Sequence, residues 1–220
     1  RNPVVDLPKN AMELIEKTTV CLVTHSQKWG IEALTHTDHF DLAGQRFLKQ
    51  NDIPVVCPSA DAATMAKHRL NVLAGLGYWR PQPFLAGQIT AVPARHGHGV
   101  LQHLMANDAG FFLELPDEPS IYISGDTVLT PDVERALTQF KPDIAVVAAG
   151  CARMDIGRPI LMTQDEIIWF IELSPSAVIA NHMDALNHCS ITRDHLKTVV
   201  KERQLAEKVV IPEDGESIRF

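Results

Sequence analysis

The chain has 220 residues, of which 45% are hydrophobic and 21% charged, and its formal net charge is −7 at pH 7. This length and composition predict a single globular domain over residues 1–220 and argue against a disordered chain. The acidic balance argues against a nucleic-acid-binding surface, because phosphate backbones require clustered Lys and Arg.

The predicted elements alternate between short β-branched segments and amphipathic ones, a pattern typical of an α/β protein whose helices cover sheets. The predicted strands are 18–25, 53–58, 88–94, 110–116, 120–126, 143–150, 176–182, 208–212 and 217–220. The predicted helices are 41–50, 59–69, 130–140, 163–173 and 192–204. Several helix starts carry capping residues, including Asp41 and the Thr163–Glu166 pair. The segments 77–87 and 150–162 are predicted loops, which either turn at the surface or wall a pocket.

The remaining composition bears on location and partners. No apolar run approaches the ~18 residues of a membrane span, and the segment RNPVVDLPKN lacks the regions of a secretory signal. Four widely spaced cysteines without a CxxC pair indicate free thiols in a reducing compartment. We therefore expect a cytoplasmic protein without a membrane partner, and a homo-oligomer stays open.

Histidines and aspartates recur where predicted strands end. The residues that share this position are His25, His36, Asp38, His39, His96, Asp126 and His182. Strand ends can share one edge of a sheet, where such side chains converge on an ion. Imidazole and carboxylate together suit zinc, manganese or iron. A single histidine of this kind is more often structural, so the metal site is predicted from the repetition.

The segment THTDHFD suggests two neighbouring ions. In a tight loop, His36 can face one ion while Asp38 and His39 face the other, and Asp126 can bridge them. Two divalent ions about 3.5–4 Å apart make a hydroxide available near neutral pH, and this hydroxide attacks carbonyl or phosphoryl centres.

The motifs THTDHFD, PARHGHG, YISGDT and ANH, in this order, resemble the metallo-β-lactamase superfamily, whose signature is HxHxDH followed by His, Asp and His at later strand ends. The resemblance covers nearly the whole chain and is strongest to the branch that includes ascorbate-6-phosphate lactonase. It implies an α/β (α+β) fold, an αββα sandwich of two mixed sheets flanked by helices. Few residues precede VCLVTH, so the first strands of that sandwich are expected to be missing or reduced.

The resemblance also implies the ligand sets. The first site would comprise His25, His36 and His96, and the second Asp38, His39 and His182, with Asp126 between them. The family's first motif histidine would stand at Leu34, which cannot bind a metal, so His25 is expected to replace it and SQKWGIEALT to be an insertion. If His25 does not replace the motif histidine, the first site has only two histidines, and the protein holds one ion or none.

Other residues near these motifs are candidates for supporting roles. The candidate catalytic residues are Asp38 and His188, and His188 is expected to act as general acid because the related branch often has a histidine just beyond its last ligand. Asp184 could orient a ligand, and Trp79 could flank a pocket mouth or pack in the core. The arginines that could meet a substrate carboxylate or phosphate, or lie on the surface, are Arg95, Arg153 and Arg158.

These residues together predict a metal-dependent hydrolase. A metal-bound hydroxide would cleave an ester, lactone or phosphodiester bond of a small substrate, which is either neutral or anionic. The expected cofactors are two divalent ions, zinc first, with manganese or iron as alternatives. One rival is a phosphodiesterase or nuclease using the same metals, and the other is a metal-binding or scaffold protein of this fold with little or no turnover. Cys151 and Cys189 lack the context of a nucleophilic thiol.

Overall fold

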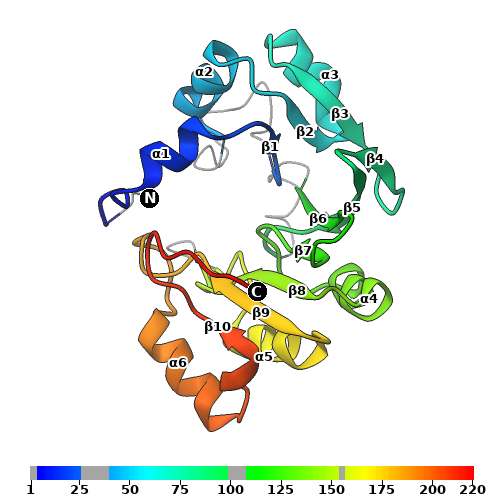
Figure 1. Ribbon diagram of the computed structural model, residues 1–220. Coiled ribbons are helices and arrows are strands. Elements are labelled where there is room, and N and C mark those ends of the chain that lie inside the picture. The colour runs from blue at the N-terminus through cyan, green and yellow to red at the C-terminus, as the bar shows by residue number, and fades with distance from the viewer. Residues whose placement is uncertain (1–3, 26–39, 99–107, 154–156) are drawn as a thin grey trace.

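The computed structural model describes residues 4–25, 40–98, 108–153 and 157–220. Its elements form four layers, helices, sheet, sheet and helices (Figure 1). In chain order these elements are α1 (Ala11–Glu16), β1 (Cys21–Leu22), α2 (Leu42–Gln50), β2 (Val55–Pro58), α3 (Ser59–Lys67), β3 (Val72–Leu76), β4 (Gln82–Phe84), β5 (Gly87–Ala94), β6 (Asp108–Glu114), β7 (Ile121–Ile123), α4 (Pro131–Phe140), β8 (Ile144–Ala148), α5 (Gln164–Leu173), β9 (Ala177–Asn181), α6 (Arg193–Glu202), the 3₁₀ turn η3 (Ala206–Lys208) and β10 (Val209–Val210). No helix in these four ranges is long and apolar enough to cross a membrane.

The order of the strands explains the layers. The small sheet has the order β1-β2-β3 with parallel strands, and the large sheet has the order β10-β9-β8-β7-β6-β5-β4. Strands β7 to β10 run parallel, whereas β4 to β7 form an antiparallel meander. Parallel neighbours need crossovers of one hand, so α4, α5 and α6 cover one face of the large sheet, and α2 and α3 cover one face of the small sheet. The two uncovered faces then pack against each other.

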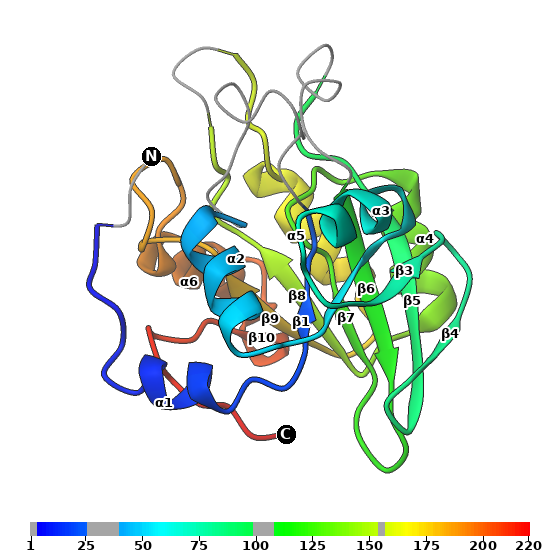
Figure 2. The ribbon, with the colours of Figure 1, turned by 90° about the horizontal axis from the view of Figure 1, so that it is seen from above.

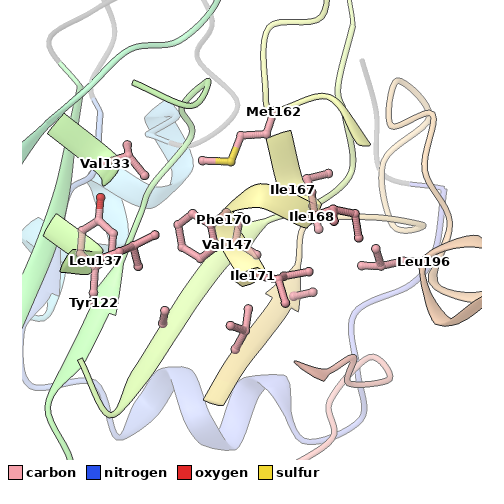
Figure 3. Close-up of a cluster of buried hydrophobic side chains, with 14 of the residues drawn as sticks. Tyr122, Val133, Leu137, Val147, Met162, Ile167, Ile168, Phe170, Ile171 and Leu196 are labelled. Atoms are coloured by element: carbon pink, nitrogen blue, oxygen red, sulfur yellow. The ribbon is translucent and has the colours of Figure 1, made fainter. Parts of the chain in front are cut away.

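The buried side chains follow these layers. On β2, Val55 and Cys57 pack toward α2 and α3, while Val56 lies between them in sequence and packs with Phe111 of the large sheet. This alternation is the period of a strand, and it leaves every residue of β2 buried because both faces are covered. On the far side of the large sheet, α5 packs its apolar face on β8, as Figure 3 shows for Phe170 and Val147.

Most predicted elements are confirmed, helix starts above all. The Asp41 side chain accepts from the Gly44 N–H at 2.6 Å and caps α2. At the start of α5, Thr163 and Glu166 form the predicted capping box. Ser59 is the first residue of α3 but makes no side-chain cap.

Several details of the predicted elements are wrong. Residues 217–220 form no strand, since the chain leaves the large sheet after β10. Strands β3 and β4 and helix α1 were not predicted. β3 contains Ala74 and Gly75, which have low strand propensity, and β4 contains Pro83, which a sheet tolerates at its edge. The predicted loop 77–87 therefore includes an edge strand.

Trp79 in this segment packs on α4. Its indole Nε1–H donates to Asp132 at 3.1 Å, and the guanidinium carbon of Arg135 lies 3.9 Å from the ring centroid. Its ring also lies 5.6 Å from that of Phe140, between centroids. These contacts make Trp79 part of the packing of the large sheet.

The sheets are joined where β1 ends and β6 begins. The Ala109 N–H donates to the Thr24 carbonyl at 2.7 Å, and the next pair, His25 and Asp108, forms an antiparallel bridge. At the same edge, the chain leaving β5 and the loop after β8 project from one end of the molecule (Figure 2). Side chains that follow strands of both sheets are thereby brought together.

Gly150, two residues after β8, lies in close contact with the loop that follows β9. Its carbonyl accepts from the N–H groups of Ser190 and Ile191 at 2.9 and 3.1 Å, which docks the loop after β9 on it. A Cβ at this position would lie 2.1 Å from the carbonyl oxygen of His182 and 2.6 Å from Sγ of Cys189. A side chain of any size would push these loops apart.

We therefore expect Gly150→Ala to lower the free energy of unfolding by about 1–3 kcal/mol, the usual cost of overpacking. The matched control is Gly77→Ala, whose Cβ would meet only Cδ of Arg80 at 3.5 Å. This control should stay within about 0.5 kcal/mol of the original chain. Urea unfolding at equilibrium measures both, and equal stability of the two variants would contradict the close approach.

Candidate metal centre

Four of the predicted metal ligands fall in the described residues. His25 and His96 follow β1 and β5, and Asp126 and His182 follow β7 and β9. His36, Asp38 and His39 lie outside the described residues, as does Leu34. The structure therefore describes four of the seven predicted ligands, and their role as ligands stays a prediction.

His25 and His96 lie together at the join of the sheets. Their ring centroids are 5.5 Å apart and the rings meet edge to face. Both residues are buried, with relative exposures of 4% and 3%. The residues come from different sheets, so only the fold brings them into contact.

A third ligand-type residue, Asp108, completes this group. One ligand atom from each of His25, His96 and Asp108 can be chosen so that all three lie within 4.8 Å of one another. Asp108 is buried, and its Oδ2 accepts from the backbone N–H of His96 at 3.1 Å. We call these three residues the first group.

Asp126 and His182 form a second pair. His182 Nε2 lies 3.5 Å from Asp126 Oδ2, and both side chains are largely buried. His182 has a φ of +58°, a left-handed conformation that is rare for a residue other than glycine. Such strain is concentrated at functional sites, where the surrounding structure holds the residue in place.

The other ring nitrogen of His182 contacts a cysteine. Its Nδ1 lies 3.6 Å from Sγ of Cys189, and this sulfur also lies 3.5 Å from the His182 carbonyl oxygen. Burial, together with the charges of Asp126 and Asp184, raises the pKa of the Cys189 thiol to about 12. The thiol is therefore protonated near neutral pH in this environment.

The residues predicted to surround the metals have the following positions. The His188 ring lies 6.4 Å from the His182 ring between centroids, at an angle of 85°. Asp184 accepts from both the backbone N–H and the guanidinium of Arg193, at 2.8 and 3.2 Å, and so holds the start of α6. This contact with Arg193 accounts for the position of Asp184, so the residue need not orient a metal ligand.

Two of the predicted arginines, Arg95 and Arg158, affect the pKa of His98. Burial lowers the pKa of His98, and Arg158 and then Arg95 lower it further, against the opposing effect of Glu166. Arg153 instead pairs its backbone with Pro159 in an isolated bridge. Positive charge is thus placed beside His98, two residues after His96.

Sequence reasoning missed Asp108. It is the first residue of β6, whereas the predicted ligands follow the last residue of a strand, and the surrounding segment NDAG resembles no ligand motif. The only signal available was a charged residue opening a strongly apolar strand, since residues 108–112 are all buried.

The donor chemistry of the first group fits a divalent metal ion. Two imidazoles and one carboxylate are a ligand set that zinc and iron sites use. Donors at about 2.0–2.2 Å from one ion are at most roughly 4.4 Å apart, so small side-chain movements suffice to bring the three donors of the first group to one ion. The Asp126–His182 pair offers the same two donor types.

Comparisons with known proteins identify the family of the chain. Residues 33–183 match the family model described as a beta-lactamase superfamily domain. The UPF0173 protein YddR of Bacillus subtilis (strain 168) is 30% identical over 222 residues, covering 100% of this chain and 83% of the relative.

Two solved structures are similar in both sequence and fold. The isothiocyanate hydrolase from Delia radicum gut bacteria matches with a TM-score of 0.84 and 30% identity, covering 100% of this chain and 83% of that one. A "possible metal-dependent hydrolase" from Veillonella parvula DSM 2008 matches with a TM-score of 0.83 and 28% identity, covering 99% of this chain and 82% of that one. With two sheets between helix layers and a family match that spans most of its length, this chain belongs to the metallo-β-lactamase superfamily.

Proposed function

We propose that this chain is a metal-dependent hydrolase acting on a small substrate with an electrophilic carbon or phosphorus. The observation that carries the proposal is the convergence of His25, His96 and Asp108, buried and with donor atoms within 4.8 Å, from segments far apart in sequence. The similarity of nearly the whole chain to an isothiocyanate hydrolase and to a protein described as a possible metal-dependent hydrolase supports it.

The ligand assignment follows the family resemblance. His25 and His96, with His36, would hold one ion, and His182, with Asp38 and His39, would hold the other. Asp126, 3.5 Å from His182, would lie between them. When bound, divalent metals lower the pKa of water and polarise the atom under attack.

Proton transfer to the leaving group is assigned to His188. Its ring lies edge-on to that of His182, with 6.4 Å between the ring centroids, which puts it beside the second pair. Histidine is the side chain best suited to proton transfer near neutral pH. Its backbone carbonyl accepts from the Arg153 N–H at 3.1 Å, which anchors the loop that carries it.

A thiol mechanism is disfavoured at this site. Cys189 is the cysteine in contact with His182, and its pKa of about 12 leaves little thiolate at neutral pH. A cysteine nucleophile would instead need a lowered pKa. Water is therefore the proposed nucleophile.

The bond that is cleaved is proposed as an ester or lactone, with isothiocyanates and phosphodiesters as the further classes to test. Esters, lactones and isothiocyanates share an electrophilic carbon bound to an electronegative atom. The isothiocyanate class enters through the related hydrolase from Delia radicum gut bacteria. The lactone class enters through the resemblance of the sequence motifs to the lactonase branch.

Elemental analysis and an activity panel test the proposal together. We expect close to two zinc, manganese or iron ions per chain, loss of turnover on chelation and recovery on re-addition. The panel should include a lactone, an ester, an aryl isothiocyanate and bis(p-nitrophenyl) phosphate. Metal-free protein that shows no turnover after addition of zinc or manganese would instead favour the scaffold alternative.

The general-acid assignment has its own test. His188→Gln should slow hydrolysis of an alkyl ester by ~100-fold or more, because the poor alkoxide leaving group needs a proton. A p-nitrophenyl ester, whose leaving group needs no protonation, should be hydrolysed at nearly the original rate. Steady-state kinetics on both esters measure this difference. The control is His195→Gln on the exposed face of α6, and equal losses on both esters would refute the assignment.

A further inference from the structure

We propose that Asp108 is itself a ligand of the first metal ion, so that this ion is held by two imidazoles and a carboxylate of the described residues. The inference deepens the proposed function and rests on it. It concerns a residue outside the sequence motifs, reached only through the fold.

The backbone around Asp108 is fixed from several sides. Its Cα is paired with Ala94 in the β5–β6 ladder and with His25 across the join of the sheets. Its carbonyl accepts from the Tyr78 hydroxyl at 2.9 Å, and the following N–H, of Ala109, donates to Thr24 at 2.7 Å. Asp108 thus projects from a rigid position, which a metal ligand requires.

The side chain is oriented toward the two histidines. Oδ2 accepts from the His96 N–H at 3.1 Å, and a carboxylate atom lies within 4.8 Å of donor nitrogens of both His25 and His96. A backbone hydrogen bond to one lone pair leaves the other carboxylate lone pairs available to an ion. The backbone donor then acts as the outer partner that orients a ligand.

Asp108 would supplement the imidazoles of the first site and not replace the motif histidine at position 34, a role already assigned to His25. The motif histidine expected at this position is replaced by Leu34, which cannot bind a metal. The described part of the site would otherwise contribute only the imidazoles of His25 and His96. A carboxylate from β6 would add a donor to these two imidazoles, beside His36 of the proposed assignment, and imidazole with carboxylate is an established combination for zinc and iron.

A simple alternative is that Asp108 only positions His96. The two roles differ in the loss of metal affinity that they predict. Loss of a residue that only orients a ligand typically weakens metal binding by about 10–100-fold. They also differ spectroscopically, because only a ligand changes the coordination of the ion.

Asp108→Asn separates these roles. The amide oxygen can still accept from the His96 N–H, so the variant keeps the orienting contact and loses the charge and the anionic donor. We expect it to weaken the tighter zinc site by more than about 100-fold, beyond the range for an outer partner, in competition with a chromophoric chelator. His25→Ala should weaken the same site comparably. The d–d absorption of the cobalt(II)-loaded protein should also shift in Asp108→Asn.

The control is Asp143→Asn, a change of the same type beyond the other end of the sheet. Asp143 precedes β8, and its Oδ2 accepts from the N–H and hydroxyl of Ser120 at 2.8 and 2.7 Å, contacts that an amide oxygen can keep. Urea unfolding of the metal-free variants shows whether each is folded. Asp108→Glu is the second variant, and it should bind zinc more tightly than Asp108→Asn because it keeps the anionic donor.

The outcomes distinguish this inference from the proposed function. If the original chain binds no zinc, both fail. If it binds zinc and Asp108→Asn binds within 100-fold of it with an unchanged cobalt spectrum, only the assignment of Asp108 is overturned.

Discussion

The hydrogen bond from the Ala109 N–H to the Thr24 carbonyl, at 2.7 Å, joins the two sheets at the edge where the candidate metal centre lies. His25 belongs to the chain leaving the small sheet, while His96 and Asp108 belong to the large sheet, so the first group exists only while the sheets keep this register. A single such bond contributes only about 0.5–1.5 kcal/mol to stability. The apolar cluster between the sheets, which includes Val56 and Phe111, supplies the stability, and the hydrogen bond fixes the alignment.

Close backbone packing at this edge restricts the residues beside the second pair. Gly125 has a φ of +66°, and a Cβ there would lie 2.8 Å from the Ala109 carbonyl oxygen. The residue that follows, Asp126, is therefore carried on a turn pressed against the start of β6. His182, with its own positive φ, follows β9, which is separated from β7 by β8 in the sheet. Both residues of the second pair thus occupy backbone positions that depend on their surroundings, as is common where function overrides local preference.

The sequence predicted what local chemistry controls. Helix caps such as Asp41 and Thr163 bond within their own turn, so a few neighbouring residues decide them. Asp108 was missed because its partners, His25 and His96, are brought to it by strand pairing and not by a spacing in the sequence. The segment 217–220 has strand-like residues but no pairing partner after β10, and Phe220 instead lines a shallow apolar hollow. Tertiary context, not propensity, separates these cases.

A carboxylate in the first group would also change the charge that a substrate meets. Two divalent ions bring four positive charges. The carboxylates of Asp38 and Asp126 would neutralise two of them and leave a net charge of about +2. With Asp108 as a further ligand only one positive charge remains, so the attraction for an anionic substrate falls while the metals can still polarise a neutral one. Arg95 and Arg158, whose charges lower the pKa of His98, would then add positive potential beside that residue. If Asp108 is a ligand, a neutral ester, lactone or isothiocyanate would suit the proposed centre better than an anionic phosphodiester.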